Sequence, residues 1–208
     1  MAVDFCPGES RGTLHGSPAG LDGMTLVYLV QHGDRERLSG DHGLTATGRH
    51  QADLTAHWLC NRGLRALYSS PLRRAQETAY IIAAVTGLPV QPDARLRERV
   101  NWDGNWSYED FLADWARATR DRDFVPHGGE SSRQAGNRLH AFVARLPAGL
   151  TPADVVTHGG VTTDLLRNLL PDQQLPAGRL ETGIPPCAIT TLEDLTAVSI
   201  AATWHLHE

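Results

Sequence analysis

Short apolar runs alternate with longer segments of helical periodicity along most of the chain. The first run, Leu26–Val30, is nearly all apolar, as expected for a strand that is covered on both faces. In segment 45–61 apolar residues recur at positions 52, 56 and 59, and the pattern ends before Gly63, which indicates a helix. The same reasoning predicts strands at 64–68, 154–157, 188–192 and 197–204, and helices at 71–86, 107–119, 130–146 and 161–170.

This alternation predicts an α/β fold, a three-layer α/β/α arrangement with a mostly parallel central sheet. No internal repeat divides the chain, so a single domain is expected over residues 25–208. Residues 1–24 are rich in Gly, Pro and Ser without apolar periodicity, and we expect a disordered tail there. The tail lacks the basic and apolar regions of a secretory signal, and Met24 is an alternative start.

Two helix starts can be predicted from capping residues. Ser70 is placed to cap a helix whose first position is Pro71. Ser107 and Asp110 form a pattern similar to a capping box at the start of another helix. Both signals place helix N-termini close to the ends of predicted strands.

Composition excludes several classes of function. The formal net charge of -5 gives no reason to expect nucleic acid or an anionic membrane as a partner, and no apolar run approaches the roughly 20 residues that span a bilayer. All 19 basic residues counted as Lys+Arg are arginine, which excludes Schiff-base and P-loop lysines. The three cysteines are far apart without metal-type spacing, and they suggest a reducing, cytoplasmic environment.

Polar side chains follow three predicted strands at the point where each strand ends. Gln31-His32-Gly33 follows the first strand, an arginine pair that includes Arg74 follows the second, and His158-Gly159-Gly160 follows the third. The carboxyl ends of parallel strands meet at one edge of a sheet, where helix N-termini attract anions. A phosphoryl group fits two histidines and an arginine in this setting.

Metal ligation is the rival use of two histidines. Asp34 and Asp164 are the nearest candidates for a carboxylate ligand, but no HExxH or comparable spacing is present. We therefore expect no metal site.

Six segments carry a resemblance to a known family: "LVQHGD", "LTATGRHQA", "LYSSPLRRAQETA", "LRER", "GGESS" and "VVTHGGV". Together, in this order and over about residues 25 to 204, they resemble the histidine phosphatase superfamily, the phosphoglycerate-mutase-like group (branch 1). The resemblance implies a phosphoglycerate-mutase-like fold and hydrolysis of a small phosphorylated substrate through a phosphohistidine, without a cofactor. A homodimer is one assembly left open.

The resemblance also implies roles for individual residues. His32 is the expected nucleophile, with one ring nitrogen free and the other held by a backbone carbonyl near Gly33. Arg74 and His158 are expected to bind the phosphoryl oxygens. Glu98 is expected to protonate the leaving oxygen and then activate water, with a pKa raised by burial or by the phosphate. Further substrate contacts are expected from Gln31, Gly33, Arg99 and Gly159.

Gln31 is the main departure from the family pattern, which has arginine before the nucleophilic histidine. One lost charge-assisted bond in a dry site is worth about 1.5–3 kcal/mol, or roughly one to two decades in rate. Nearby arginines that can compensate are Arg35, Arg37 and Arg99. The departure keeps open a non-enzymatic anion or protein binder. The short link from His32 to Leu44 favours hydrolysis over mutase activity.

Aromatic residues gather between Glu98 and His158. Phe111 and Trp115 are spaced i, i+4, and we expect them to form the core stripe of a helix. Trp102 and Trp106 are candidates for the wall of a substrate pocket. Arg73, about 100° around the helix from Arg74, is expected to be a surface charge.

Overall fold

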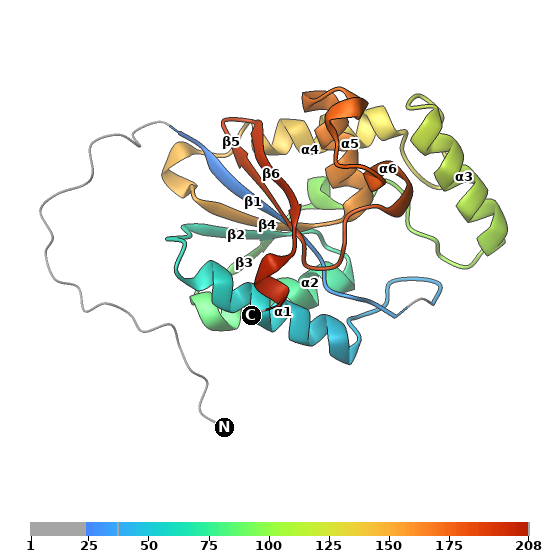
Figure 1. Ribbon diagram of the computed structural model, residues 1–208. Helices are drawn as coiled ribbons and strands as arrows, with labels where there is room; N and C mark the ends of the chain where they lie inside the picture. The colour runs from blue at the N-terminus through green and yellow to red at the C-terminus, as the bar shows by residue number, and fades with distance from the viewer. Residues whose placement is uncertain (1–23, 37, 208) are drawn as a thin grey trace, which may run out of the picture.

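The central sheet of the computed structural model, which describes residues 24–36 and 38–207, has six strands in the order β3-β2-β4-β1-β5-β6 (Figure 1). The first four strands in this order run parallel to one another. Strand β5 is antiparallel to β1, and β6 is antiparallel to β5. The predicted mostly parallel sheet is thereby confirmed. The strands are β1 (Leu26–Gln31), β2 (Ala66–Ser69), β3 (Val90–Pro92), β4 (Ala153–Thr157), β5 (Ile189–Glu193) and β6 (Thr196–Ala202). The tail predicted over residues 1–24 falls, except for Met24, outside the described residues.

Helices cover both faces of the sheet and form the two outer layers (Figure 1). Helices α1 (Ala46–Cys60) and α2 (Arg73–Thr86) lie on one face. Helices α4 (Ser132–Val143) and α5 (Gly159–Leu169) lie on the other. Helix α3 (Tyr108–Arg120) and the short α6 (Arg179–Thr182) lie beyond the sheet, on the side of the carboxyl ends of β1 and β4. Short 3₁₀ helices span Ala94–Leu96, Ala148–Leu150, Asp172–Gln174 and Trp204–Leu206.

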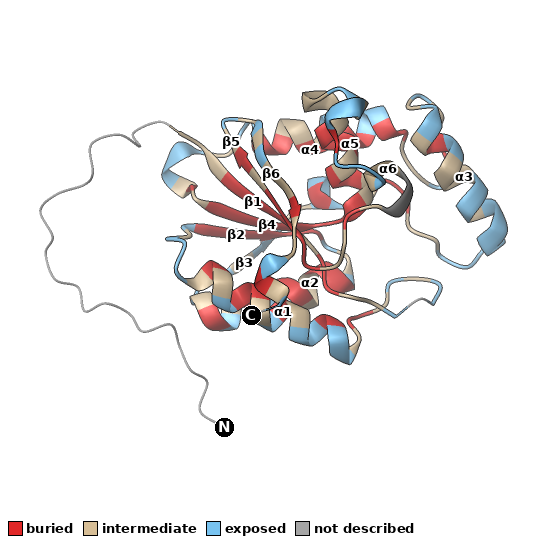
Figure 2. Ribbon diagram, in the orientation of Figure 1, coloured by how far each residue is buried: buried red, intermediate tan, exposed pale blue. Residues whose placement is uncertain are grey.

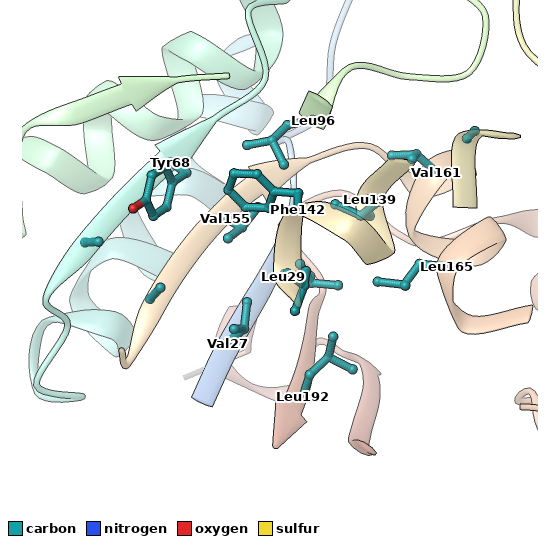
Figure 3. Close-up of a cluster of buried hydrophobic side chains, with 14 residues drawn as sticks. Val27, Leu29, Tyr68, Leu96, Leu139, Phe142, Val155, Val161, Leu165 and Leu192 are labelled. Carbon is teal, nitrogen blue, oxygen red and sulfur yellow. The ribbon is translucent and has the colours of Figure 1, made fainter. Parts of the chain in front are cut away.

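Strand β1 is buried on both faces, which explains its continuous apolar sequence (Figure 2). Val27 and Leu29 point into the cluster that also contains Phe142 of α4 (Figure 3). Tyr28 and Val30 point to the opposite face, toward the cluster under α1 and α2. This alternation follows from the two-residue period of a strand.

The predicted start of α2 is wrong. The N-cap position is Leu72, without a side-chain cap, and the first helical residue is Arg73. Ser70 instead directs its hydroxyl to His158 Nε2, at 2.7 Å, and accepts a bond from the Leu72 backbone N–H. The helix starts two residues later than predicted, and the Ser70 hydroxyl links the end of β2 to the end of β4.

Other boundaries differ for similar local reasons. Strand β3 was not predicted: it is a three-residue edge strand that ends in Pro92, too short to show a period. The helix predicted at 130–146 begins at Ser132, because Ser131 and Gln134 form a capping box. Ser107 caps α3 as predicted.

Two glycines bring the loop after β1 into close contact with helix α1. A Cβ on Gly33 would lie 2.4 Å from the Gly48 carbonyl oxygen, and a Cβ on Gly48 would lie 2.0 Å from the Asp34 carbonyl oxygen. No real Cβ reaches such distances. Gly33 is therefore required for close approach of two backbones, and not for the flexibility that a glycine after a strand suggests.

This crossing generates a stability prediction. Gly48→Ala should lower the free energy of unfolding by about 1–3 kcal/mol, because the added methyl forces backbone to shift. A decrease in the free energy of unfolding would be informative, since alanine in a helix is intrinsically favoured over glycine by about 1 kcal/mol and the substitution would otherwise be stabilising. Urea denaturation measures the change. Gly149→Ala, where nothing lies within 4 Å of the new Cβ, is the control and should change stability by less than about 0.5 kcal/mol. A neutral or stabilising Gly48→Ala would contradict the prediction.

Candidate active site

His32 follows β1 directly and is held by its backbone and its ring. Its N–H donates to the Thr157 carbonyl of β4 at 3.1 Å, and the ring Nδ1 lies 2.8 Å from the Gly33 carbonyl oxygen. A carbonyl only accepts hydrogen bonds, so Nδ1 carries the proton and Nε2 has the free lone pair. The side chain is 7% exposed and borders a cavity. This is the tautomer that the predicted nucleophile requires.

Two donors point at the free nitrogen of His32. Arg74, in the first turn of α2, donates from Nε to Nε2 over 3.1 Å. Gln31 Nε2 lies 3.3 Å from the same atom. The Arg74 guanidinium is 3% exposed and also donates to Asn101 Oδ1 over 3.1 Å. A phosphoryl group bound at His32 would therefore meet an oriented guanidinium and a carboxamide.

The environment keeps His32 neutral. Burial, with the positive charge of Arg74 as a second cause, lowers the pKa of the imidazole to about 3. Burial also lowers the pKa of Arg74, to about 10, so the guanidinium remains charged at neutral pH. The site thus combines an uncharged imidazole with a charged donor.

His158 lies beside His32 at the N-cap of α5. The two ring centroids are 5.2 Å apart, and His158 is fully buried. Its Nε2 lies 2.7 Å from Ser70 Oγ, and its Nδ1 has no partner among the described residues. Burial holds the pKa of His158 well below its usual range, and Arg74 adds to this effect.

Glu98 caps the start of α5 from a neighbouring loop. Its carboxylate accepts three backbone N–H bonds, each at 2.9 Å, from Gly160, Val161 and Arg99. A carboxylate has about four lone-pair sites, so one remains for a proton or a water. Glu98 forms no ion pair with Arg97 or Arg99 among the described contacts; Arg97 pairs with Glu130 instead.

Arg99 is placed behind the cavity of His32. Its guanidinium is 3% exposed, donates to Asp164 over 3.0 Å and lies on the Trp115 ring, 3.9 Å from the centroid. Burial raises the pKa of Asp164 to about 6, although Arg99 opposes the shift. The predicted contact of Arg99 with the substrate would thus compete with this ion pair.

The catalytic cavity, which we define as the space bordered by His32, measures about 600 Å³. Gln31 and Arg35 line it on the side of β1, and Asn101 lines it from the loop after Glu98. Arg35 remains a candidate to compensate for a missing arginine, whereas Arg37 lies outside the described residues. Gly159 lies outside this wall and lines a neighbouring cavity.

Helix α3 supplies an aromatic wall to the cavity. Trp102, Tyr108 and Phe111 line it, and Trp115 lines smaller cavities beside it. The prediction of a core stripe for Phe111 and Trp115 is wrong: both are half-buried, and Ala118 is the buried residue of α3. The helix lies over the ligand side of the sheet and not on its face, so its apolar stripe faces the cavities. Trp102 lines the cavity as predicted.

Trp106 and Arg73 both lie away from the cavities of the site. Trp106 lines none of the cavities described here and packs on Phe111 and His127. Arg73 is a surface charge, as predicted: it is 62% exposed and pairs with Glu77. The described residues contain no group of three or more His, Cys, Asp or Glu side chains placed to hold a metal ion.

Several site residues escaped the sequence analysis. Ser70 was interpreted as a cap, although it contacts His158. Asn101 contacts Arg74, and the only feature of the sequence that could have indicated this contact was its position two residues after Arg99. Arg179 and Ile184 line the cavity from the segment before β5, where no pattern marked them.

The comparison with protein families decides what this arrangement represents. The model described as "Histidine phosphatase superfamily (branch 1)" matches residues 27–197. The chain belongs to this superfamily. The match covers β1 with His32, the Arg74 helix, Glu98 and the end of β4 with His158.

Individual members of the histidine phosphatase superfamily show which proteins the chain is similar to. A curated relative, the probable phosphoglycerate mutase GpmB of Yersinia pestis (strain Pestoides F), is 35% identical over 164 residues, covering 71% of this chain and 75% of the relative. The solved structure named mycobacterial hydrolase 1 is 31% identical with a TM-score of 0.65, covering 80% and 88%. Mycobacterial glucosyl-3-phosphoglycerate phosphatase with VO3 is 29% identical with a TM-score of 0.68, covering 86% and 100%. The solved structures thus share the fold and include phosphatases.

Among the described residues, no helix has the length and apolar character needed to cross a bilayer.

The charge state of His32 can be tested directly. The folded imidazole should remain neutral at pH 5, and Arg74→Met should raise its pKa, because a buried positive charge is removed. Since an unfolded histidine protonates near pH 6.5 and the folded one near 3, stability should fall as pH drops through this window. NMR titration of ¹⁵N-labelled histidines measures the pKa.

The matched control is the neighbouring arginine. Arg73→Met removes an exposed charge that pairs with Glu77 and should leave the pKa of His32 unchanged. An imidazole of His32 that titrates near pH 6.5 in the wild-type protein would contradict the prediction.

Proposed function

We propose that this histidine phosphatase hydrolyses phosphate monoesters of a small metabolite through a phosphohistidine on His32, without a cofactor. The observation that carries the proposal is the His32 ring, whose Nδ1 is fixed by the Gly33 carbonyl while Nε2 faces Arg74. The hydrolase and the phosphatase among its structural neighbours support the reaction class.

The first step is attack of His32 Nε2 on phosphorus, which breaks the bond to the leaving oxygen. The imidazole gains positive charge, and the Gly33 carbonyl stabilises it by accepting from Nδ1–H. Arg74 bonds the phosphoryl oxygens and has the formal charge to offset the charge on them. His158 Nδ1, without a protein partner among the described residues, is available to a phosphoryl oxygen.

The second step is hydrolysis of the phosphohistidine, in which Glu98 takes a proton from the attacking water. Glu98 can accept this proton because it gave its own to the leaving oxygen in the first step. The three backbone donors around Glu98 orient the carboxylate and leave about one lone-pair site for this proton. Water then breaks the N–P bond and inorganic phosphate leaves, which regenerates neutral His32.

Gln31 stands where the family pattern has arginine, and we propose that it lowers the rate without abolishing the reaction. Its carboxamide brings a donor to His32 Nε2 but no charge. Arg35 lines the same cavity and adds positive charge near His32, as its lowering effect on the pKa of His32 indicates.

Phosphoenzyme trapping tests the proposed reaction. After rapid mixing with para-nitrophenyl phosphate and quenching, mass spectrometry should find phosphate on His32, and the phosphate should pass to water. His32→Ala should remove the label and lower turnover by at least roughly three decades, since the nucleophile is lost. The exposed His57→Ala is the control. Absence of label and of turnover over a broad panel of esters would exclude the hydrolase. Transfer of the label to a second substrate hydroxyl would identify a mutase.

Substitution of Gln31 separates a slow enzyme from a binding protein. Gln31→Arg should raise kcat/KM by roughly one to two decades, because a charged donor then faces the phosphoryl group. Gln31→Met, which removes the donor, should lower it. Steady-state kinetics with para-nitrophenyl phosphate measures both. If Gln31→Arg creates activity in a protein that has none, the natural protein is an anion or protein binder and the proposal fails.

A further inference from the structure

A second cavity lies beside the catalytic cavity. It measures about 210 Å³, and the two share Gln31, Arg179, Gly183 and Ile184 in their walls. Glu98 and Gly160 also line it, at the start of α5. A Cβ on Gly160 would lie 2.5 Å from Glu98 Oε1, so the glycine leaves this carboxylate uncovered. The second cavity is thus a polar extension of the space in front of His32.

Four side chains in this wall have a buried polar atom without a hydrogen-bond partner among the described residues. Folded proteins leave few such atoms, because an unsatisfied buried group costs about 1–3 kcal/mol. Their concentration in one wall favours a polar occupant for this cavity. The four atoms are Gln31 Oε1, Arg99 Nε, Thr163 Oγ1 and Arg179 Nε.

The four atoms differ in hydrogen-bonding type. The two guanidinium nitrogens donate only, the Gln31 oxygen accepts only, and the Thr163 hydroxyl does both. A carboxylate or phosphate could satisfy the donors but would repel the Gln31 oxygen. A hydroxyl group donates and accepts, so several hydroxyls can satisfy all four atoms.

The charges around the cavity also disfavour an anion. Arg99 pairs with Asp164 at 3.0 Å, and Arg167 pairs with Asp172 at 2.8 Å. Of the three arginines in the wall, Arg179 is thus the one without an acidic partner among the described ion pairs. A single guanidinium offsets only part of the desolvation cost of a second anionic group.

We propose that the second cavity holds neutral hydroxyl groups of the leaving group, and that the preferred substrates are phosphate monoesters of polyols. The phosphoryl group then lies at His32 and Arg74, and the hydroxylated part of the substrate extends past Gln31 toward Thr163 and Arg179. This inference rests on the proposed hydrolase function for its catalytic readout.

Three phosphate esters with six carbons test the inference. Sorbitol 6-phosphate carries hydroxyls, hexyl phosphate is apolar, and hexane-1,6-diol bisphosphate carries a second anion. The kcat/KM for sorbitol 6-phosphate should exceed both others by at least roughly tenfold, because a site with buried polar groups rejects analogues that leave them unpaired. Equal or greater activity on hexyl phosphate, or a preference for the bisphosphate, would overturn the inference.

A conservative variant locates the effect in the second cavity. Thr163→Val removes one hydroxyl with little change in volume and should lower the preference for sorbitol 6-phosphate over hexyl phosphate by roughly fivefold. Thr86→Val is the control: its hydroxyl bonds only within α2, to the Ile82 carbonyl, and the preference should not change. An unchanged preference in Thr163→Val would overturn the inference.

A binding measurement separates this inference from the proposed function. Calorimetric titration of His32→Ala, or of the wild-type protein if it shows no turnover, compares the affinities of the same three esters. Tighter binding of sorbitol 6-phosphate that Thr163→Val weakens supports the polyol site even if no phosphohistidine forms. Equal affinities for the three esters overturn the inference even if His32 is phosphorylated.

Discussion

The hydrogen bond from His32 Nδ1 to the Gly33 carbonyl, at 2.8 Å, is the contact on which the chemistry of this histidine phosphatase depends. It leaves the lone pair on Nε2, the only ring atom that faces Arg74 and Gln31. The carbonyl belongs to Gly33, whose backbone lies so close to that of Gly48 that neither residue has space for a Cβ. The bond therefore lies in a closely packed part of the backbone, where it fixes the tautomer of the His32 ring.

Burial has opposite uses on the two sides of the site. It keeps His32 and His158 uncharged, as the proposed mechanism requires. Arg74 remains charged in the same surroundings and is oriented by Asn101. The neutral His32 ring can therefore lie 3.1 Å from a cation, and the proposed phosphoryl ligand would supply the negative charge that this arrangement lacks.

The start of α5 links the catalytic cavity with the second cavity. His158 occupies its N-cap, while Glu98 accepts from the N–H groups of Gly160 and Val161. A carboxylate at a helix N-terminus is stabilised by the helix dipole and by bonds from N–H groups that have no partner within the helix. Arg99, the next residue, is turned away into its ion pair with Asp164. One short segment therefore places a carboxylate at the start of α5 and a guanidinium in the wall of the second cavity.

The fold class, the order of the main elements and the edge of the sheet where His32, Arg74 and His158 meet could all be predicted from the amino-acid sequence. These features follow from apolar periodicity and from the direction of parallel strands, which are local or topological properties. Contacts between side chains that are distant along the chain could not be predicted in this way, because they depend on how the whole chain packs. Ser70 reaches His158 instead of capping α2, and Phe111 and Trp115 face cavities because α3 lies beyond the sheet. The helical period of α3 shows that one side of it is apolar, but what that side faces depends on where the whole chain places the helix.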